Sequence, residues 1–182
     1  MSSFRKSLAA LAGLLAASTL LVSLGAVGSP AAQDQKKTTV EGVWKVAEVV
    51  VPGATPAEKA TTVTSPQPGL LIFTKGYYSS TLVTGGQARP AVEPPKDPQN
   101  LTDAEKLARF EQWRPFAANA GTYEVKGATI IRRPVVAKSV NVMTSTTPIT
   151  AEFKLDGPNT LWLTPTGERA ATDPRVKYTR VE

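Results

Sequence analysis

Short runs in which apolar and polar residues alternate recur along the chain, most clearly in its C-terminal half. In residues 149–155 every second residue is apolar, and the residues between them are polar. A period of two puts successive side chains on opposite faces of a β-strand. Such runs, with others rich in β-branched residues, predict eight strands, at residues 40–51, 70–74, 77–84, 122–126, 128–133, 149–155, 160–164 and 175–180.

One segment has a helical pattern instead. Thr102-Asp103-Ala104-Glu105 matches a capping box, in which the threonine hydroxyl and the glutamate carboxylate satisfy backbone amides at the start of a helix. Leu107, Phe110 and Trp113 follow at intervals of three and form one apolar stripe. Pro115 kinks or ends the helix. We expect one α-helix at about 102–114, with its stripe packed against the rest of the domain.

The connections between the expected strands indicate how the strands are arranged. Lys75-Gly76 and Asp156-Gly157 are typical of tight turns, whereas the proline-rich stretches 52–69 and 85–100 predict long loops. Short connections between neighbours imply an antiparallel meander. Eight strands can form a sandwich or a closed barrel, and closure removes the exposed edges of a sheet. We therefore predict an all-β fold, an eight-stranded antiparallel barrel with one α-helix.

The N-terminus has the pattern of a secretory signal peptide. Arg5 and Lys6 precede an uncharged apolar run at 8–24, and small residues suited to a signal peptidase follow it. A retained membrane anchor is the alternative, although about 17 residues is near the lower limit for spanning a bilayer. We expect a cleaved signal at 1–32, a flexible leader at 33–39 and one domain at 40–182. The mature protein would then be periplasmic or secreted in a bacterium, without a stable membrane span.

Composition excludes several classes of function. The 182 residues include no cysteine and no histidine, so disulfides, thiol catalysis and the commonest zinc ligands and general base are absent. The acidic residues are scattered, and we expect neither a metal site nor a cofactor. Without Arg5 and Lys6, the 21 basic residues fall to 19 against 15 acidic ones, a net charge of +4. No basic stripe is visible, which argues against nucleic-acid binding.

Four blocks resemble the bacterial lipocalin-like domain family, a group of calycin-type β-barrels. Gly42-Val43-Trp44-Lys45 is similar to the G-x-W signature of the first lipocalin strand, and residues 69–79 are similar to the family's "G-L-L-I-Y…G-Y-M-S" hairpin. Residues 121–125 match its G-T-Y-E-V block, and residues 178–181 are similar to its closing strand. The resemblance implies that Trp44 seals the closed end of the barrel and that a basic residue of the last strand, here Arg180, covers it.

The same alternation predicts which residues could contact a ligand inside the barrel. The inward candidates are Tyr78, Ser80, Leu82, Tyr123, Val125 and Phe153. Tyr78 and Tyr123 could orient a polar group, since each has an apolar ring and a hydroxyl. Arg132 or Arg133 could receive a carboxylate at the rim of the barrel. Ordinary core packing or surface charge is the alternative for each of these residues.

Three classes of function follow. The leading one is binding of a small apolar or amphipathic molecule, and a connected apolar cavity would favour it. The second is an envelope interaction module using loops 52–69 and 85–100, favoured by a filled barrel with an exposed apolar patch. The third is an isomerase or cyclase working without His or Cys. Acid–base work would then fall to Asp, Glu, Lys or Tyr. Glu48 is a candidate if the alternation turns it inward, whereas a β-bulge would turn it outward.

Overall fold

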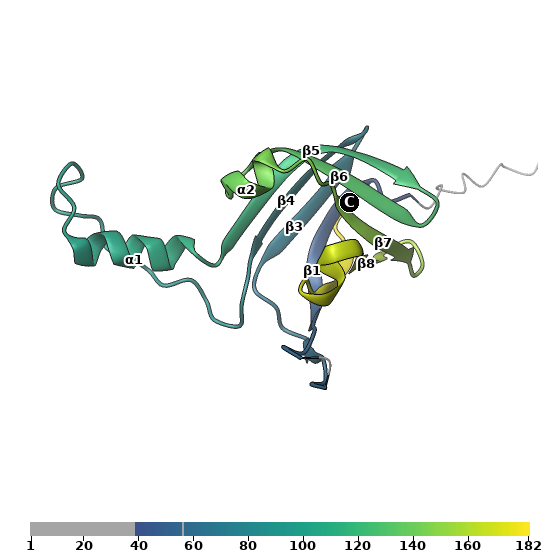
Figure 1. The fold of residues 1–182 in the computed structure, drawn as a ribbon, viewed down its shortest axis with the longest axis horizontal. Helices are drawn as coiled ribbons and strands as arrows, with labels where there is room; N and C mark the ends of the chain where they lie inside the picture. Colours follow the sequence, from purple (N-terminus) through teal and green to yellow (C-terminus); the bar gives the residue numbers. More distant parts are fainter. Residues whose placement is uncertain (1–38, 56) are drawn as a thin grey trace, which may run out of the picture. The chain divides into compact units, whose positions relative to one another are not determined.

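The computed structural model describes residues 39–55 and 57–182, so the expected signal peptide and nearly all of the leader lie outside the described residues. Figure 1 shows the elements in order. They are β1 (Gly42–Val51), β2 (Thr61–Val63), β3 (Gly69–Thr74), β4 (Tyr77–Val83), α1 (Asp103–Trp113), β5 (Phe116–Lys126), β6 (Thr129–Ala137), α2 (Val140–Thr144), β7 (Ile149–Leu155), β8 (Thr160–Pro165), the 3-10 helix η1 (Gly167–Ala171) and β9 (Arg175–Arg180).

The strands form a closed antiparallel barrel. From β3 to β9 each strand pairs with its neighbour in the sequence, and β1 pairs with both β3 and β9, so that the sheet meets itself. The short strand β2 adds to the end of β1, where Val50 lies opposite Thr62. This arrangement confirms the predicted eight-stranded antiparallel barrel, with β2 as an extra strand that the sequence pattern had placed in a loop.

Two strands are longer than predicted, and a bulge explains how they pair. β5 begins directly after α1, at Phe116, and β6 continues to Ala137. The register between them shifts at Ala120 and Gly121, next to Pro134. Proline has no amide hydrogen to donate to a ladder, so a bulge is a place where a strand tolerates it. A Cβ atom at Gly121 would collide with the carbonyl oxygen of Arg133, and this close approach requires glycine.

The closed end of the barrel is built around Trp44. Its side chain is fully buried, together with Leu71 and Phe73, and its indole Nε1 donates a hydrogen bond of 2.7 Å to the carbonyl oxygen of Val40. The sequence resemblance placed Arg180 over this ring, and the guanidinium Cζ lies 4.1 Å from the ring centroid. That distance is within the range of a cation–π contact.

Arg180 also forms hydrogen bonds to the backbone around the closed end of the barrel. Its guanidinium donates to the carbonyl oxygens of Thr39 at 2.7 Å, Glu41 at 2.6 Å and Pro158 at 2.7 Å. The first two belong to the segment that enters β1, and the third belongs to the β7–β8 turn. One side chain therefore joins three parts of the chain over the Trp44 ring.

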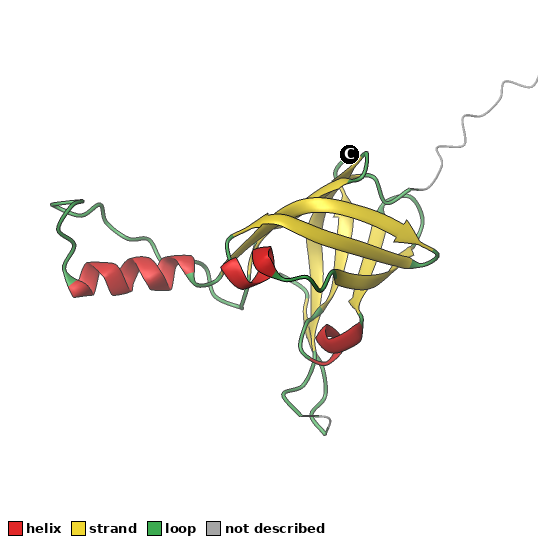
Figure 2. Cartoon of the chain, turned by 45° about the horizontal axis from the view of Figure 1, so that its top comes forward, coloured by secondary structure: helices red, strands yellow, loops and turns green. Residues whose placement is uncertain are grey.

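The helix α1 begins where the capping box predicts, but its apolar stripe does not pack against the domain as expected. Thr102 accepts a hydrogen bond from the amide of Glu105, and the Glu105 side chain accepts one from the Thr102 amide. The expectation that the apolar stripe packs against the domain is wrong, because Leu107, Phe110 and Trp113 are 61%, 59% and 51% exposed. Figure 2 shows α1 standing away from the strands of the barrel.

The contacts of α1 explain this position. The proline-rich segment before the helix folds back on it, and Arg89 places its guanidinium 5.1 Å from the Trp113 ring and 5.2 Å from the Phe116 ring. Lys138, just after β6, donates to the carbonyl oxygens of Trp113 and Phe116 at the end of the helix. A cation there complements the helix dipole. Among the described residues, no helix is long and apolar enough to span a membrane.

Replacement of Arg180 by methionine tests the seal at the closed end. We expect Arg180→Met to lower the free energy of unfolding by about 2 kcal/mol, because it removes a cation–π contact and leaves three carbonyl groups without a charged donor. Arg175→Met is the matched control, since Arg175 lies 3.9 Å from the Trp162 ring but is itself exposed. It should cost less than about 0.5 kcal/mol. Urea unfolding measures both, and equal losses would show that Arg180 is only a surface residue.

Replacement of Lys138 by glutamine tests whether this lysine anchors the C-terminal end of α1 to the barrel. Loss of the cation should free the end of the helix, so chymotrypsin should cleave at Leu107, Phe110 or Trp113 faster than in the unmodified protein. The melting temperature of the barrel should change little, because the lysine is exposed and contacts only this region. Lys126→Gln, at an exposed lysine on β5, should leave the cleavage rate unchanged. Equal cleavage of both variants and the unmodified protein would contradict the anchoring role.

Candidate ligand-binding site

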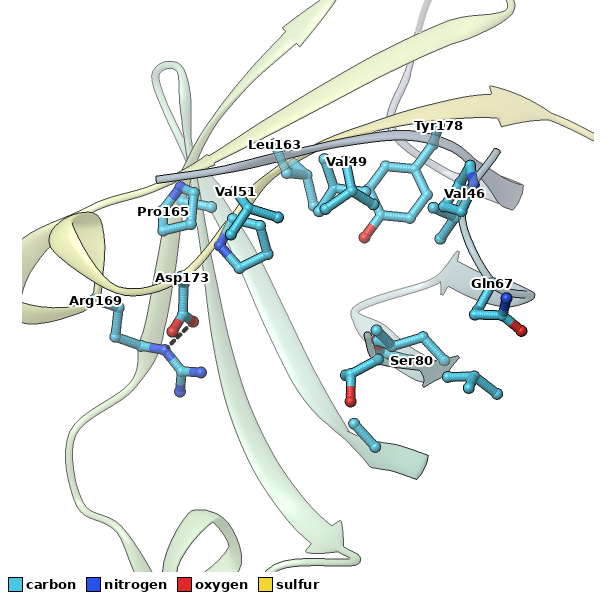
Figure 3. A pocket seen from close by; sticks show the side chains of 18 of the residues that line it. Val46, Val49, Val51, Gln67, Ser80, Leu163, Pro165, Arg169, Asp173 and Tyr178 are labelled. Carbon is cyan, nitrogen blue, oxygen red and sulfur yellow. Dashed lines mark hydrogen bonds and ion pairs between the residues drawn. The ribbon is translucent and has the colours of Figure 1, made fainter. Parts of the chain in front are cut away.

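The barrel contains a cavity of about 540 Å³. Its walls come from the inner faces of β1 and of β4 to β9, and it reaches the segments 84–86 and 169–174 at the end of the barrel opposite Trp44. Figure 3 shows the apolar side chains that form much of the wall. They include Val46, Val49, Val51, Leu82, Leu163 and Val176. A cavity of this size and lining is within the range that holds one small molecule.

A bulge in β1 decides which residues of that strand line the cavity. The pairing of β1 with β9 skips one residue between Val46 and Glu48. Val49 and Val51 therefore continue the inner face that begins at Trp44 and Val46, and Glu48 is not part of the cavity wall. Of the two alternatives drawn from the sequence, the structure has the bulge. No carboxylate of β1 is available inside the barrel for acid–base chemistry.

The structure brings three of the predicted ligand-binding residues into the cavity wall: Ser80, Leu82 and Arg132. Tyr78 is buried beside them, with its ring centroid 5.5 Å from the guanidinium carbon of Arg132. The Tyr78 hydroxyl donates a 2.7 Å hydrogen bond to Oδ1 of Asn119, which is itself part of the wall. The burial of Tyr78 raises the pKa of its phenol, and the charge of Arg132 partly offsets that rise.

The other predicted residues are elsewhere. Tyr123 and Phe153 pack against the core outside the cavity, and the Tyr123 ring lies 4.7 Å from that of Phe73. Val125 is not part of the cavity wall, and it is 43% exposed. The pairing of β4 with β5 ends at Tyr77 and Thr122, so Val125 extends past the end of β4 and has no strand to cover it on that side.

Arg132 lies in the cavity wall. It lies opposite Tyr123 on β5 and Ile149 on β7. Its Nε atom is buried and has no hydrogen-bond partner among the described residues. Burial lowers the pKa of the guanidinium, and Tyr178 and Tyr78 act in the opposite direction. Arginine nevertheless keeps its charge in proteins, so the cavity contains a positive charge.

The neighbouring arginine has a different environment. Arg133 points to the exterior, where its guanidinium forms a 2.7 Å ion pair with Glu124. Both side chains are substantially exposed, so the pair contributes little to stability. The hydrogen bonds from Arg133 and Lys126 hold the pKa of Glu124 below its ordinary value. The structure thus separates the two arginines that the sequence left as equal candidates.

Sequence reasoning missed two features of the site. Tyr178 lies in the wall, and Figure 3 shows its hydroxyl pointing into the cavity. Burial raises the pKa of this phenol, so the hydroxyl keeps its proton at neutral pH. The alternation of Val176, Tyr178 and Arg180 already put Tyr178 on the inner face. The second feature is an ion pair of 2.6 Å between Arg169 and Asp173, in a segment without strand periodicity.

Nothing in the described part of the chain gathers three or more acidic side chains into a possible metal site. Apart from the Arg169–Asp173 ion pair, the polar side chains of the cavity wall are hydroxyls, amides and the guanidinium of Arg132, which suit an organic ligand better than a cation. Searches of protein-family models and of curated proteins find no match to the chain.

Proposed function

We propose that this protein is a lipocalin-like binding protein that holds one small apolar or amphipathic molecule inside its barrel. The observation that carries the proposal is the cavity of about 540 Å³ bounded by valine, leucine and proline side chains. Burial of apolar surface is the main source of affinity in such a site. The G-x-W block, with Trp44 under Arg180 at one end, supports the comparison with lipocalin-like barrels.

Export belongs to the same proposal. The charged start, apolar run and small residues of segment 1–32 support a cleaved signal peptide, and delivery to the periplasm or exterior would follow. In that location a binding protein would meet molecules that are poorly soluble in water. Mass spectrometry of the protein purified from a bacterial envelope tests this directly, because retention of residues 1–32 would contradict it.

The two other classes of function have unequal support. For an enzyme, the candidate carboxylate Glu48 lies outside the cavity wall, and the one carboxylate among the described wall residues, Asp173, is paired with Arg169. An interaction module has one observation in its favour, the exposed stripe of Leu107, Phe110 and Trp113 on α1. We place it second, because the barrel is hollow rather than filled.

Adjacent residues of β4 provide a matched pair of variants to test ligand binding. Leu82 lies in the cavity wall, whereas Thr81 next to it is exposed on the outer face. Leu82→Trp should fill part of the cavity and weaken binding of the neutral fluorescent probe N-phenyl-1-naphthylamine by about tenfold or more, a change of about 1.4 kcal/mol. Thr81→Trp should leave the affinity unchanged.

Fluorescence titration measures the affinities, and circular dichroism checks that both variants fold. Saturable binding of one probe per barrel is expected for the unmodified protein. The absence of saturable binding, or an equal effect of the two tryptophans, would contradict the proposal and move support to the interaction module.

A further inference from the structure

Arg132 is a charge in the cavity wall, with its Nε atom buried, for which the described residues provide no counter-ion. Its Nε has no hydrogen-bond partner among them, and the five ion pairs that they form do not include this arginine. An isolated buried charge is costly, and folded proteins normally pair it. The fold nevertheless directs Arg132 inward and pairs the next residue, Arg133, with Glu124 outside. No described residue supplies a partner for Arg132, so its guanidinium is available to a ligand that enters the cavity.

The groups around Arg132 can complete a site for an anion. The Tyr78 ring lies 5.5 Å from the guanidinium carbon of Arg132, but its hydroxyl already donates to Asn119, so the tyrosine hydroxyl available to a ligand is that of Tyr178 in the cavity wall. The Tyr178 hydroxyl points into the cavity, as Figure 3 shows. Ser80 and Asn119 lie opposite each other on β4 and β5 and add a hydroxyl and an amide to the same wall. Hydroxyl and amide groups are the donors that surround a bound carboxylate.

Charge balance decides between kinds of anion. At the mouth, Arg169 and Asp173 neutralise each other at 2.6 Å. The cavity is therefore left with one net positive charge, that of Arg132. A single negative charge balances it, whereas a phosphate group of about two charges would leave an uncompensated negative charge in an apolar enclosure. A carboxylate also matches the planar guanidinium, which can hold both of its oxygens.

The positions of the apolar residues indicate how the ligand is oriented along the barrel. Arg132 contacts Tyr78, which belongs to the buried core, whereas Val49, Val51 and Leu82 lead toward the segments at the mouth. We propose that the ligand is an amphiphile with one carboxylate, bound with the carboxylate against Arg132 and with its apolar body directed toward the mouth. This inference rests on the proposed function and specifies the chemical class of the ligand.

Two probes with the same tail separate the head group from the apolar body. Dodecanoate and 1-dodecanol, each used below the concentration at which it aggregates, should compete with N-phenyl-1-naphthylamine for the cavity. We expect dodecanoate to compete about 10 to 100 times more tightly than 1-dodecanol, the range given by hydrogen bonds to a charged group. Equal competition by the two probes would overturn the inference and leave the proposed function standing. If the naphthylamine itself fails to bind, the proposed function fails.

Variants of the two arginines locate the effect. Arg132→Met should abolish the preference for dodecanoate while affinity for 1-dodecanol stays within about threefold, and Arg133→Gln should keep the preference. The ligand-free Arg132→Met protein should melt no lower than the unmodified protein, because a buried unpaired charge has been replaced by an apolar side chain. A preference that survives Arg132→Met, or is lost in Arg133→Gln, would overturn the assignment.

A structural role for Arg132 predicts a different result. If Arg132 only packs against Tyr78, Arg132→Met should lower the melting temperature and leave the ratio of the two affinities unchanged. Arg132→Lys keeps the charge but loses the planar group, and we expect it to retain only part of the preference. This variant, with the two probes on the unmodified protein, decides the question even if Arg132→Met does not fold.

Discussion

The pairing of β1 with β9 is the constraint on which the rest of the structure depends. Without it, the sheet would be an open meander with two exposed edges, and the inner face would have no enclosed volume. With it, Trp44 lies under Arg180 at one end, and the valines of β1 face a cavity at the other. The bulge between Val46 and Glu48 is part of this pairing. It keeps the charged side chain out of the barrel at the point where the wall changes from core to cavity.

The two arginines of the inner face illustrate opposite solutions to the burial of charge. Arg180 has an aromatic ring on one side and carbonyl oxygens around its edge, so its environment is complete within the protein. Arg132 has aromatic neighbours but an unsatisfied Nε. The first arrangement is satisfied within the protein, whereas the second leaves a donor facing the cavity without a partner among the described residues. Incomplete satisfaction of a buried polar group is typical of a binding site and not of a structural core.

Local signals in the sequence predicted most of the fold. The alternation in 149–155 and 175–180 and the turn residues Lys75-Gly76 and Asp156-Gly157 gave strands and hairpins that the structure has. The capping box gave the helix to within a residue. The strand β2 was missed because three residues in a proline-rich stretch have no detectable period. The prediction that α1 packs against the domain was wrong, because amphipathic spacing shows that a helix has an apolar stripe but does not show what covers that stripe.

The site was less predictable, for a physical reason. Alternation assigns a residue to the inner face, and it did so for Ser80 and Leu82. It does not say how far along the barrel that residue lies, which depends on the stagger between neighbouring strands. Val125 is on the inner face and still exposed, because β4 ends before it. Arg132 and Arg133 could be distinguished only when the register of β5 and β6 was known.

The segment between β4 and β5 leaves the barrel and returns to it at nearly one point. Val83 and Phe116 are direct partners, and the amide of Thr84 donates to the carbonyl oxygen of Pro115 at 2.6 Å. The ladder on either side is complete without the residues between, and the entropy of closing a loop grows slowly with its length. Gly85 and Gly86 have open space around them at this junction. Mutation can therefore lengthen, shorten or exchange the helix-bearing insert without changing the strands that form the barrel wall. The exterior of the protein and the interior of the barrel can then evolve separately.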